Sequence, residues 1–187
     1  MKIDQVPNAL LLGEVVVSDK AYNGDRYVLW DHKIKIEWDD AITRAFRTSY
    51  LGWVYLIVVD GEIYKIGQSS AGNGIEGTLS FYMSAGFDDA GINRFAINWM
   101  IRDEMDKGRK VQFYGIYQEP VVIETKGLFT TGHHEMISAK GMEAQAISDY
   151  LDSEGTYPVW NYQESGNTLD ADISKAFGQY KIDRKVA

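Results

Sequence analysis

Hydrophobic and polar residues alternate in several short segments, a pattern typical of half-buried strands. Between Lys33 and Trp38, for example, every second residue is apolar. Strands are expected wherever such segments, or short apolar runs, are bounded by turn residues: 11–17, 26–38, 53–59, 62–67 and 111–117.

Helices are predicted where apolar residues recur every three or four positions. In segment 93–107, Asn93 is the expected N-terminal cap and Gly108 the expected stop. Other helices are expected at 39–48 (capped by Asp39 or Asp40), 75–84, 141–152 (ending near Gly155) and 168–177. Segment 118–140 fits neither pattern. The chain is therefore expected to have an α+β fold, with a small three-stranded antiparallel sheet of 53–59, 62–67 and 111–117 flanked by helices and an N-terminal β-rich extension.

The turn at Asp60-Gly61 decides which side chains of the predicted hairpin share a face. A two-residue turn would place Lys65 on an apolar face, and burying an unpaired charge is costly. We therefore prefer a three-residue loop, 59–61, with Gly61 in the left-handed conformation of a bulge. In this register Tyr55 lies opposite Lys65. The two-residue turn stays open as an alternative, because the preferred register puts two isoleucines on the face of Lys65.

Composition narrows the class of protein. The chain has 187 residues, of which 45% are hydrophobic, so we expect one sizeable core. It has no Cys, which excludes disulfides, zinc–thiolate sites and thiol catalysis. No apolar run has the length of a membrane span, and the N-terminus lacks the pattern of a signal peptide. We expect a cytoplasmic protein with no membrane partner.

Charge argues against a nucleic-acid partner, because the formal net charge is −8 and phosphate binding depends on Lys and Arg. The deficit is uneven: residues 1–50 hold 7 basic and 8 acidic side chains, whereas residues 51–187 hold 12 and 19. The N-terminal segment is therefore close to balanced, and any basic surface that faces DNA is expected to be relatively enriched there.

Several short motifs carry a resemblance to a known family. Val54-Tyr55-Leu56 is followed by Lys65-Ile66-Gly67, then by Tyr82, Glu143 and Asn161. In order and spacing these motifs resemble the GIY-YIG nuclease superfamily over residues 53–162, and its type II restriction endonucleases with Lys in the second motif in particular. The resemblance implies an N-terminal extension of residues 1–50 (a DNA-contacting or dimer element), a nuclease core of residues 51–165 and a C-terminal helix and tail of residues 166–187.

One position departs from the family pattern, because Thr78 stands where the family has an Arg. Three explanations are open: a naturally inactive relative, an engineered change that blocks cutting, or transfer of the phosphate-clamping role to Arg94. We favour the second, because the other matched positions are intact.

The resemblance implies a metal-dependent endonuclease that hydrolyses double-stranded DNA, most simply a type II restriction enzyme acting as a homodimer. Glu143 would bind Mg²⁺ or another divalent cation, and Tyr55 or Lys65 would be the general base. We expect Lys65 to lower the pKa of Tyr55. Tyr82 would contact the phosphate or water, and Asn161 and Arg94 would bind substrate.

The alternatives are a phage, repair or mobile-element nuclease of the same superfamily and an inactive DNA-binding module. For Glu143 without the resemblance, an ordinary rim carboxylate paired with Lys140 is the simpler reading.

Overall fold

The computed structural model describes residues 1–21, 30, 32–84 and 91–186 and has the expected α+β architecture. Its central sheet is antiparallel with strand order β2-β1-β5-β3-β4. The sheet has five strands, not the three expected, because β1 (Leu10–Ala21) pairs with β5 (Val111–Gln118) and brings β2 (His32–Trp38) with it. The N-terminal strands therefore extend the same sheet.

The remaining elements match the sequence pattern to different degrees. Strands β3 (Gly52–Val59) and β4 (Glu62–Ser69) and helices α2 (Gly74–Ser84) and α3 (Ile92–Asp106) lie where they were expected. The helix expected over 39–48 is only the short α1 (Arg44–Arg47), whose cap is Thr43. Further helices are α4 (Ala139–Glu154), α5 (Tyr162–Ser165) and α6 (Ala171–Val186), with a short 3₁₀ turn at Ile3–Gln5. Residues 26–29 and 31 of the expected second strand lie outside the described residues.

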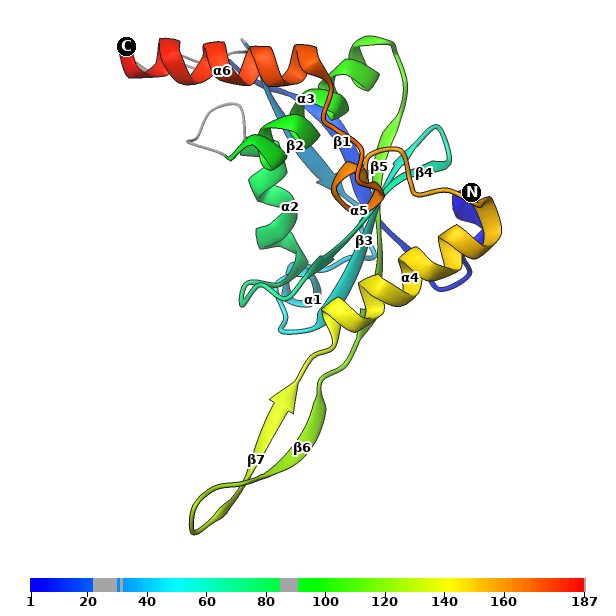
Figure 1. The fold of residues 1–187 in the computed structure, drawn as a ribbon, viewed down its shortest axis with the longest axis vertical. Coiled ribbons are helices and arrows are strands. Elements are labelled where there is room, and N and C mark those ends of the chain that lie inside the picture. The colour runs from blue at the N-terminus through cyan, green and yellow to red at the C-terminus, as the bar shows by residue number, and fades with distance from the viewer. Residues whose placement is uncertain (22–29, 31, 85–90, 187) are drawn as a thin grey trace.

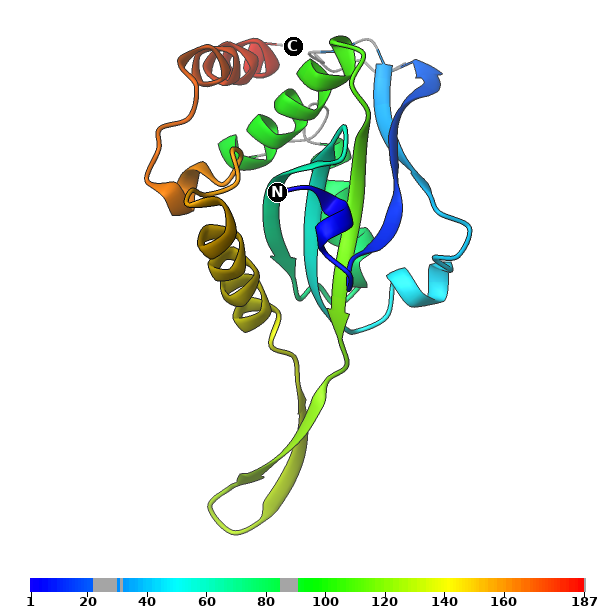
Figure 2. The ribbon, with the colours of Figure 1, turned by 90° about the vertical axis from the view of Figure 1, so that its right-hand side faces the viewer.

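Helices cover both faces of the sheet (Figures 1 and 2). On one face, Trp53, Tyr55 and Ile57 of β3 pack in a core that includes residues of α2 and α3. On the other face, Val54 and Leu56 pack in a second core with Tyr150 of α4. The 52–59 strand is buried along its whole length because both of its faces are covered.

The β3–β4 hairpin corrects the expected register. Asp60 and Gly61 form a two-residue turn with positive φ values of 48° and 84°, and Val59 pairs with Glu62. The ladder then shifts between Ile57 and Val58, so a bulge in β4 inserts one extra residue. As a result Lys65 lies opposite Ile57 rather than opposite Tyr55. The three-residue loop was wrong, but the bulge still places Lys65 on the same face as Tyr55.

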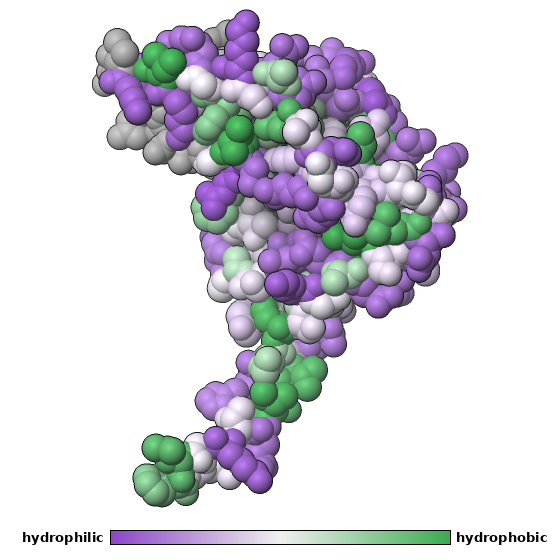
Figure 3. Space-filling model, viewed as in Figure 1, coloured by the Kyte–Doolittle hydropathy of each residue, from purple (hydrophilic) through white to green (hydrophobic). Residues whose placement is uncertain are grey.

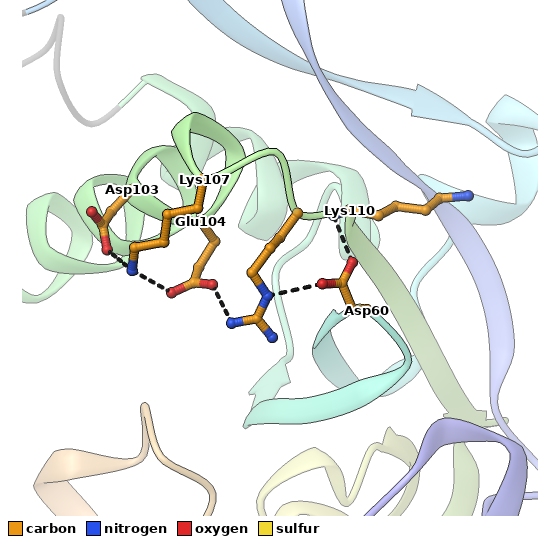
Figure 4. Close-up of polar contacts among 6 residues, drawn as sticks. Asp60, Asp103, Glu104, Lys107 and Lys110 are labelled. Atoms are coloured by element: carbon orange, nitrogen blue, oxygen red, sulfur yellow. Dashed lines mark hydrogen bonds and ion pairs between the residues drawn. The ribbon is translucent and has the colours of Figure 1, made fainter.

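An ion-pair network holds the hairpin turn against the end of α3 (Figure 4). Arg109 donates to Asp60 at 2.9 Å and to Glu104 at 2.6 Å, and the backbone N–H of Lys110 donates to the other oxygen of Asp60. Lys107 bridges to Glu104 at 3.0 Å. The side chain of Asp60 thus anchors the turn to the start of β5.

Helix caps follow the sequence at the C-terminal ends more closely than at the N-terminal ends. Gly108 and Gly155 adopt positive φ at the ends of α3 and α4, as expected. Asn93 is not the cap of α3; Gly91 holds that position, and Asn93 instead accepts a hydrogen bond from the hydroxyl of Tyr162 at 3.2 Å. Helix α6 packs on α3 through a separate aromatic cluster.

Segment 118–140 forms a second sheet, the hairpin of β6 (Val121–Lys126) and β7 (Thr131–Met136). We call residues 121–136 the arm, because Figures 1 and 2 show them projecting away from the rest of the molecule. In the described part of the chain, no helix combines the length and the hydropathy that crossing a lipid bilayer requires.

Candidate functional site

Two tyrosines form the centre of the candidate site. Tyr55, in the middle of β3, is only 3% exposed, and its hydroxyl lies 2.5 Å from that of Tyr82 on α2. Gly67 makes this position possible, because a Cβ at residue 67 would overlap the phenol of Tyr55. The strand pair and the helix thus hold both hydroxyls at one point beside β4.

Lys65 reaches this point from β4. Burial lowers the pKa of its ammonium, while the carboxylates of Glu164 and Glu143 act in the opposite direction. Lys65 therefore lies between an apolar surface and two acidic groups. The two carboxylates only partly offset the cost of burying this charge.

Glu143 approaches the same point from α4, on the other side of the sheet. It reaches the edge strand, where its carboxylate accepts a hydrogen bond from the backbone N–H of Gln68. Burial raises its pKa, Glu164 raises it further, and Lys65 opposes both more strongly than Lys140 does. The carboxylate of Glu143 thus interacts with Lys65 as well as with Lys140, the partner expected for an ordinary rim carboxylate.

The expected effect of Lys65 on Tyr55 was wrong. The pKa of Tyr55 lies well above its usual value, first because the phenol is buried and then because Tyr82, Glu143 and Glu164 surround it with negative or hydrogen-bonding groups. Tyr55 is therefore held as a neutral phenol, a donor or acceptor of hydrogen bonds rather than a phenolate.

Thr78 and Arg94 occupy different parts of the site. Thr78 lies one helical turn before Tyr82, and its hydroxyl is 2.5 Å from that of Ser69 at the end of β4. Arg94, at the start of α3, stacks over the ring of Phe81 at 4.2 Å. Its charge lowers the pKa of Tyr82, although burial, the larger effect, raises it. Arg94 is thus an exposed cation whose charge acts on Tyr82.

Asn161 lies behind the site rather than in it. Its side chain is fully buried and forms two hydrogen bonds of 2.8 Å with the backbone N–H and C=O of Ile66. The backbone N–H of Trp160 donates to Tyr64 next to it. Residues 160–161 therefore take the place of a neighbouring strand on the edge of β4. The predicted substrate-binding role of Asn161 stays a prediction.

Glu164 belongs to the site but was not identified from the sequence. It lies on α5, three residues after Asn161, and interacts electrostatically with Tyr55, Lys65, Tyr82 and Glu143. No motif marks it in the sequence, and its nearness to Asn161 was the one available signal. Its exposure gives it contact with solvent at the mouth of the site.

The structure thus brings together Tyr55, Lys65, Tyr82 and Glu143 from four different elements, with Glu164 and Arg94 at the rim. The carboxylates of Glu143 and Glu164 and the two phenols offer only oxygen atoms as possible metal ligands. Within the described ranges, no three His, Cys, Asp or Glu side chains form a group that could enclose a metal ion. A divalent cation here would therefore need water or substrate oxygens to complete its coordination.

Comparisons with known proteins give a limited likeness. No protein-family model matches the chain, and no curated protein matches its sequence. Among solved structures it is similar to restriction endonuclease HPY188I in complex with product DNA, with 16% identity, a TM-score of 0.48 and coverage of 85% of this chain and 84% of that one. It is also similar to a variant of bacteriophage T4 EndoII, with 15% identity, a TM-score of 0.48 and coverage of 86% and 98%. Both are likenesses of chain path at low sequence identity.

Proposed function

We propose that this protein is a metal-dependent DNA endonuclease of the GIY-YIG type that hydrolyses phosphodiester bonds. The observation that carries the proposal is the convergence of Tyr55, Tyr82, Lys65 and Glu143 at one edge of the sheet. These are the positions at which the sequence resembles that superfamily, although they are up to 88 residues apart in the chain.

The donor set fits a hard divalent cation such as Mg²⁺. Mg²⁺ is commonly held by one or two carboxylates and completes its octahedron with water and phosphate oxygens. Glu143 would hold the ion, and Glu164 faces the same space. The raised pKa of Glu143 reflects burial and a neighbouring carboxylate, and a cation between them would relieve both effects. When bound, the ion would supply charge stabilisation for the phosphate and the leaving oxygen.

The protein side chains would orient and activate the attacking water. The neutral phenols of Tyr55 and Tyr82 can hydrogen-bond to water or to a phosphate oxygen, and their mutual hydrogen bond fixes their direction. Lys65, with its lowered pKa, stands beside them as proton acceptor or as a cation toward the phosphate. Of the two candidates for the general base, Lys65 is the one whose pKa shift favours the role.

Arg94 is the candidate for the phosphate clamp that Thr78 cannot provide. A guanidinium binds two phosphate oxygens through its planar fork, whereas a hydroxyl offers one donor. Arg94 is exposed, and its charge reaches Tyr82. We therefore propose the third explanation for Thr78, transfer of the clamping role, in place of an engineered change.

Within this class, we propose a type II restriction endonuclease acting on double-stranded DNA. A catalytically inactive DNA-binding module is the second candidate. The hydrogen bond between Thr78 and Ser69 favours this second candidate. It places two neutral hydroxyls at the position where the family has a positively charged Arg.

The test is cleavage of supercoiled plasmid and of long DNAs of diverse sequence, with Mg²⁺ or with EDTA. Four proteins are compared: the native chain, Glu143→Gln, Arg94→Ala and Thr78→Arg. Glu124→Gln, an exposed carboxylate on the arm, is the matched control for Glu143→Gln. We expect cleavage by the native chain and by the control, and a loss of at least about 100-fold for Glu143→Gln and Arg94→Ala.

Each outcome distinguishes the candidates. If only Thr78→Arg cuts, the nuclease proposal stands but the clamping role of Arg94 is wrong. If none of the proteins cuts but the native chain binds DNA, the inactive module is correct. Discrete fragments from long DNA would support a restriction enzyme, and a smear would support a less specific nuclease.

A further inference from the structure

The arm exposes large apolar side chains that the rest of the molecule leaves uncovered. Leu128 and Phe129, at its tip, are 93% and 96% exposed. Val121, Val122 and Met136, nearer its base, are each more than half exposed. Figure 3 shows this as hydrophobic colour along the arm and at its tip. An isolated two-stranded hairpin is marginally stable in water, so this element needs a surface to pack against.

The two faces of the arm differ in character. Cross-strand pairing places Val121 with Met136 and Ile123 with His134 on one face. The pair of Glu124 and His133 occupies the opposite face. Val122 also lies on this second face, paired with Glu135, so the second face is mixed and the face of Val121 and Met136 is the more apolar one.

Charge disfavours nucleic acid as the occupant. The arm contains two carboxylates, Glu124 and Glu135, and one lysine, Lys126. Binding to the DNA backbone depends on clustered Lys and Arg, which the arm lacks. A protein surface of apolar character is the better match.

Such a surface lies at the base of the arm on this same chain. A cavity of about 410 Å³ opens between α4 and the sheet; Val54, Ile116, Met142 and Ala146 form the apolar part of its wall, and polar side chains that include Gln145 and Asp149 form the rest. A smaller cavity of about 90 Å³ continues it toward the N-terminus. A cavity of ~150 Å³ is large enough for benzene, so the larger one can accept the ring of a phenylalanine.

The position of this cavity matches the length of the arm. Gln118 and Ser138, which flank the arm at its base, both line the cavity. Each strand of the arm has six residues, which span roughly 20 Å at the usual rise. Two arms lying antiparallel about a two-fold axis therefore place the tip of each at the base of the other. The same two surfaces are then used twice, as a two-fold interface requires.

We propose that the arm is a dimerisation element, and that Leu128 and Phe129 of one chain dock into the cavity at the base of the arm of a second copy. Leu128 and Phe129 at the tip and Val121 and Met136 on the apolar face would each bury on the order of 100 Å², and the neighbouring arm atoms together with the cavity wall that each chain offers bring the total toward the ~800 Å² per partner of a stable interface. The proposal depends on the arm and the cavity alone and is independent of the chemistry of the tyrosine site.

Cross-linking tests the predicted contact directly, because the native chain contains no cysteine. Thr130→Cys places a thiol at the tip and leaves both anchors intact, and Gln145→Cys places one at the cavity. An equimolar mixture of the two variants should give a reducible covalent dimer under mild oxidation. The matched control pairs Thr130→Cys with Asn167→Cys, an exposed position after α5, and should give none. Equal yields from both mixtures would overturn the proposal.

Sedimentation equilibrium tests the energetics. The native chain should dimerise, and the Leu128→Ser, Phe129→Ser double variant should raise the dissociation constant about 100-fold or more, because each substitution acts twice in a two-fold interface. Val159→Ser, at an exposed apolar position far along the chain, is the control and should leave the constant unchanged. A native chain that is monomeric at ~100 µM, or a dimer that the tip variant does not weaken, would overturn the proposal. A monomer whose DNA binding falls in the tip variant would assign the arm to nucleic acid instead.

Discussion

The buried side chain of Asn161 makes a sharp prediction about stability. Its two hydrogen bonds of 2.8 Å satisfy both backbone groups of Ile66 on the edge strand of the sheet. Replacing it with Ala removes both partners and leaves an N–H and a C=O unpaired in a buried position. Each unsatisfied group costs about 1–3 kcal/mol, and water that enters the space would reduce the cost. We therefore expect Asn161→Ala to lower the free energy of unfolding by about 3 kcal/mol.

The measurement is urea unfolding followed by tryptophan fluorescence, together with thermal unfolding. For a chain of this length, about 3 kcal/mol corresponds to a fall in Tm of roughly 6–12 °C. Asn167→Ala is the matched control, because Asn167 is exposed. It should change the free energy of unfolding by less than about 0.5 kcal/mol.

The result separates two roles for Asn161. A residue that only binds substrate can be truncated without loss of stability, and its loss would weaken substrate binding alone. If Asn161→Ala unfolds within ~0.5 kcal/mol of the native chain, the structural reasoning is refuted. The predicted substrate-binding role would then be the better account.

Two further predictions concern the hairpin. Hydrogen bonds from the backbone of Lys110 and from its arginine neighbour lower the pKa of Asp60, so its contribution to stability is present above its unfolded pKa and is lost as pH falls through the lower folded pKa. Asp60→Asn should therefore lower the Tm at pH 7, and its difference from the native chain should shrink as the pH falls below ~4 in a thermal-unfolding series; a difference independent of pH would contradict this. Gly67→Ala should lower the free energy of unfolding by about 1–3 kcal/mol, because the added methyl group overlaps Tyr55. Gly72→Ala, where a Cβ meets open space, is its control in the same urea titration, and equal values for the two variants would show that Tyr55 yields without cost.

Local sequence patterns were sufficient to locate many of the helices and strands and to name the residues of the candidate site. Strand β3 is a continuous apolar run, and α2 and α3 have helical periodicity and glycines at their ends, so each could be located from neighbouring residues alone. The four side chains at the centre of the site were named from the family resemblance that their order and spacing carry. Their convergence depends on sheet pairing, which those spacings do not determine.

The register of the hairpin could not be obtained from the sequence, because a bulge in β4 reconciles two preferences that otherwise conflict. Asp60-Gly61 favours a two-residue turn, which without a bulge would place Lys65 on the apolar face of Val54 and Leu56. The charge of Lys65 favours the other face, that of Tyr55. We treated these as alternatives, whereas the chain satisfies both by inserting one residue. The cost of a bulge is decided by packing against the helices, which pattern alone does not report.

Long-range contacts explain the other differences. The pairing of β1 with β5 joins residues near position 13 to residues near 113, and no local pattern encodes it. Glu164 has no motif of its own and is placed by the anchoring of Asn161. The arm was not assigned from the sequence because Gly, Thr and His interrupt the alternation of apolar and polar residues that is typical of a strand.

The attachment of residues 160–161 to the edge of β4 has a consequence for the order of synthesis. Ile66 and Asn161 are 95 residues apart, so the edge of β4 at Ile66 stays unpaired until residues 160–161 have left the ribosome. At ~5–20 residues per second, that interval lasts on the order of 5–20 s. Glu143 emerges in the last part of this interval and Glu164 just after it, so the nascent chain carries the tyrosine pair long before it carries the acidic groups. The acidic side of the candidate site is therefore completed only after Glu164 has emerged, and a shorter nascent chain holds the tyrosine pair without it.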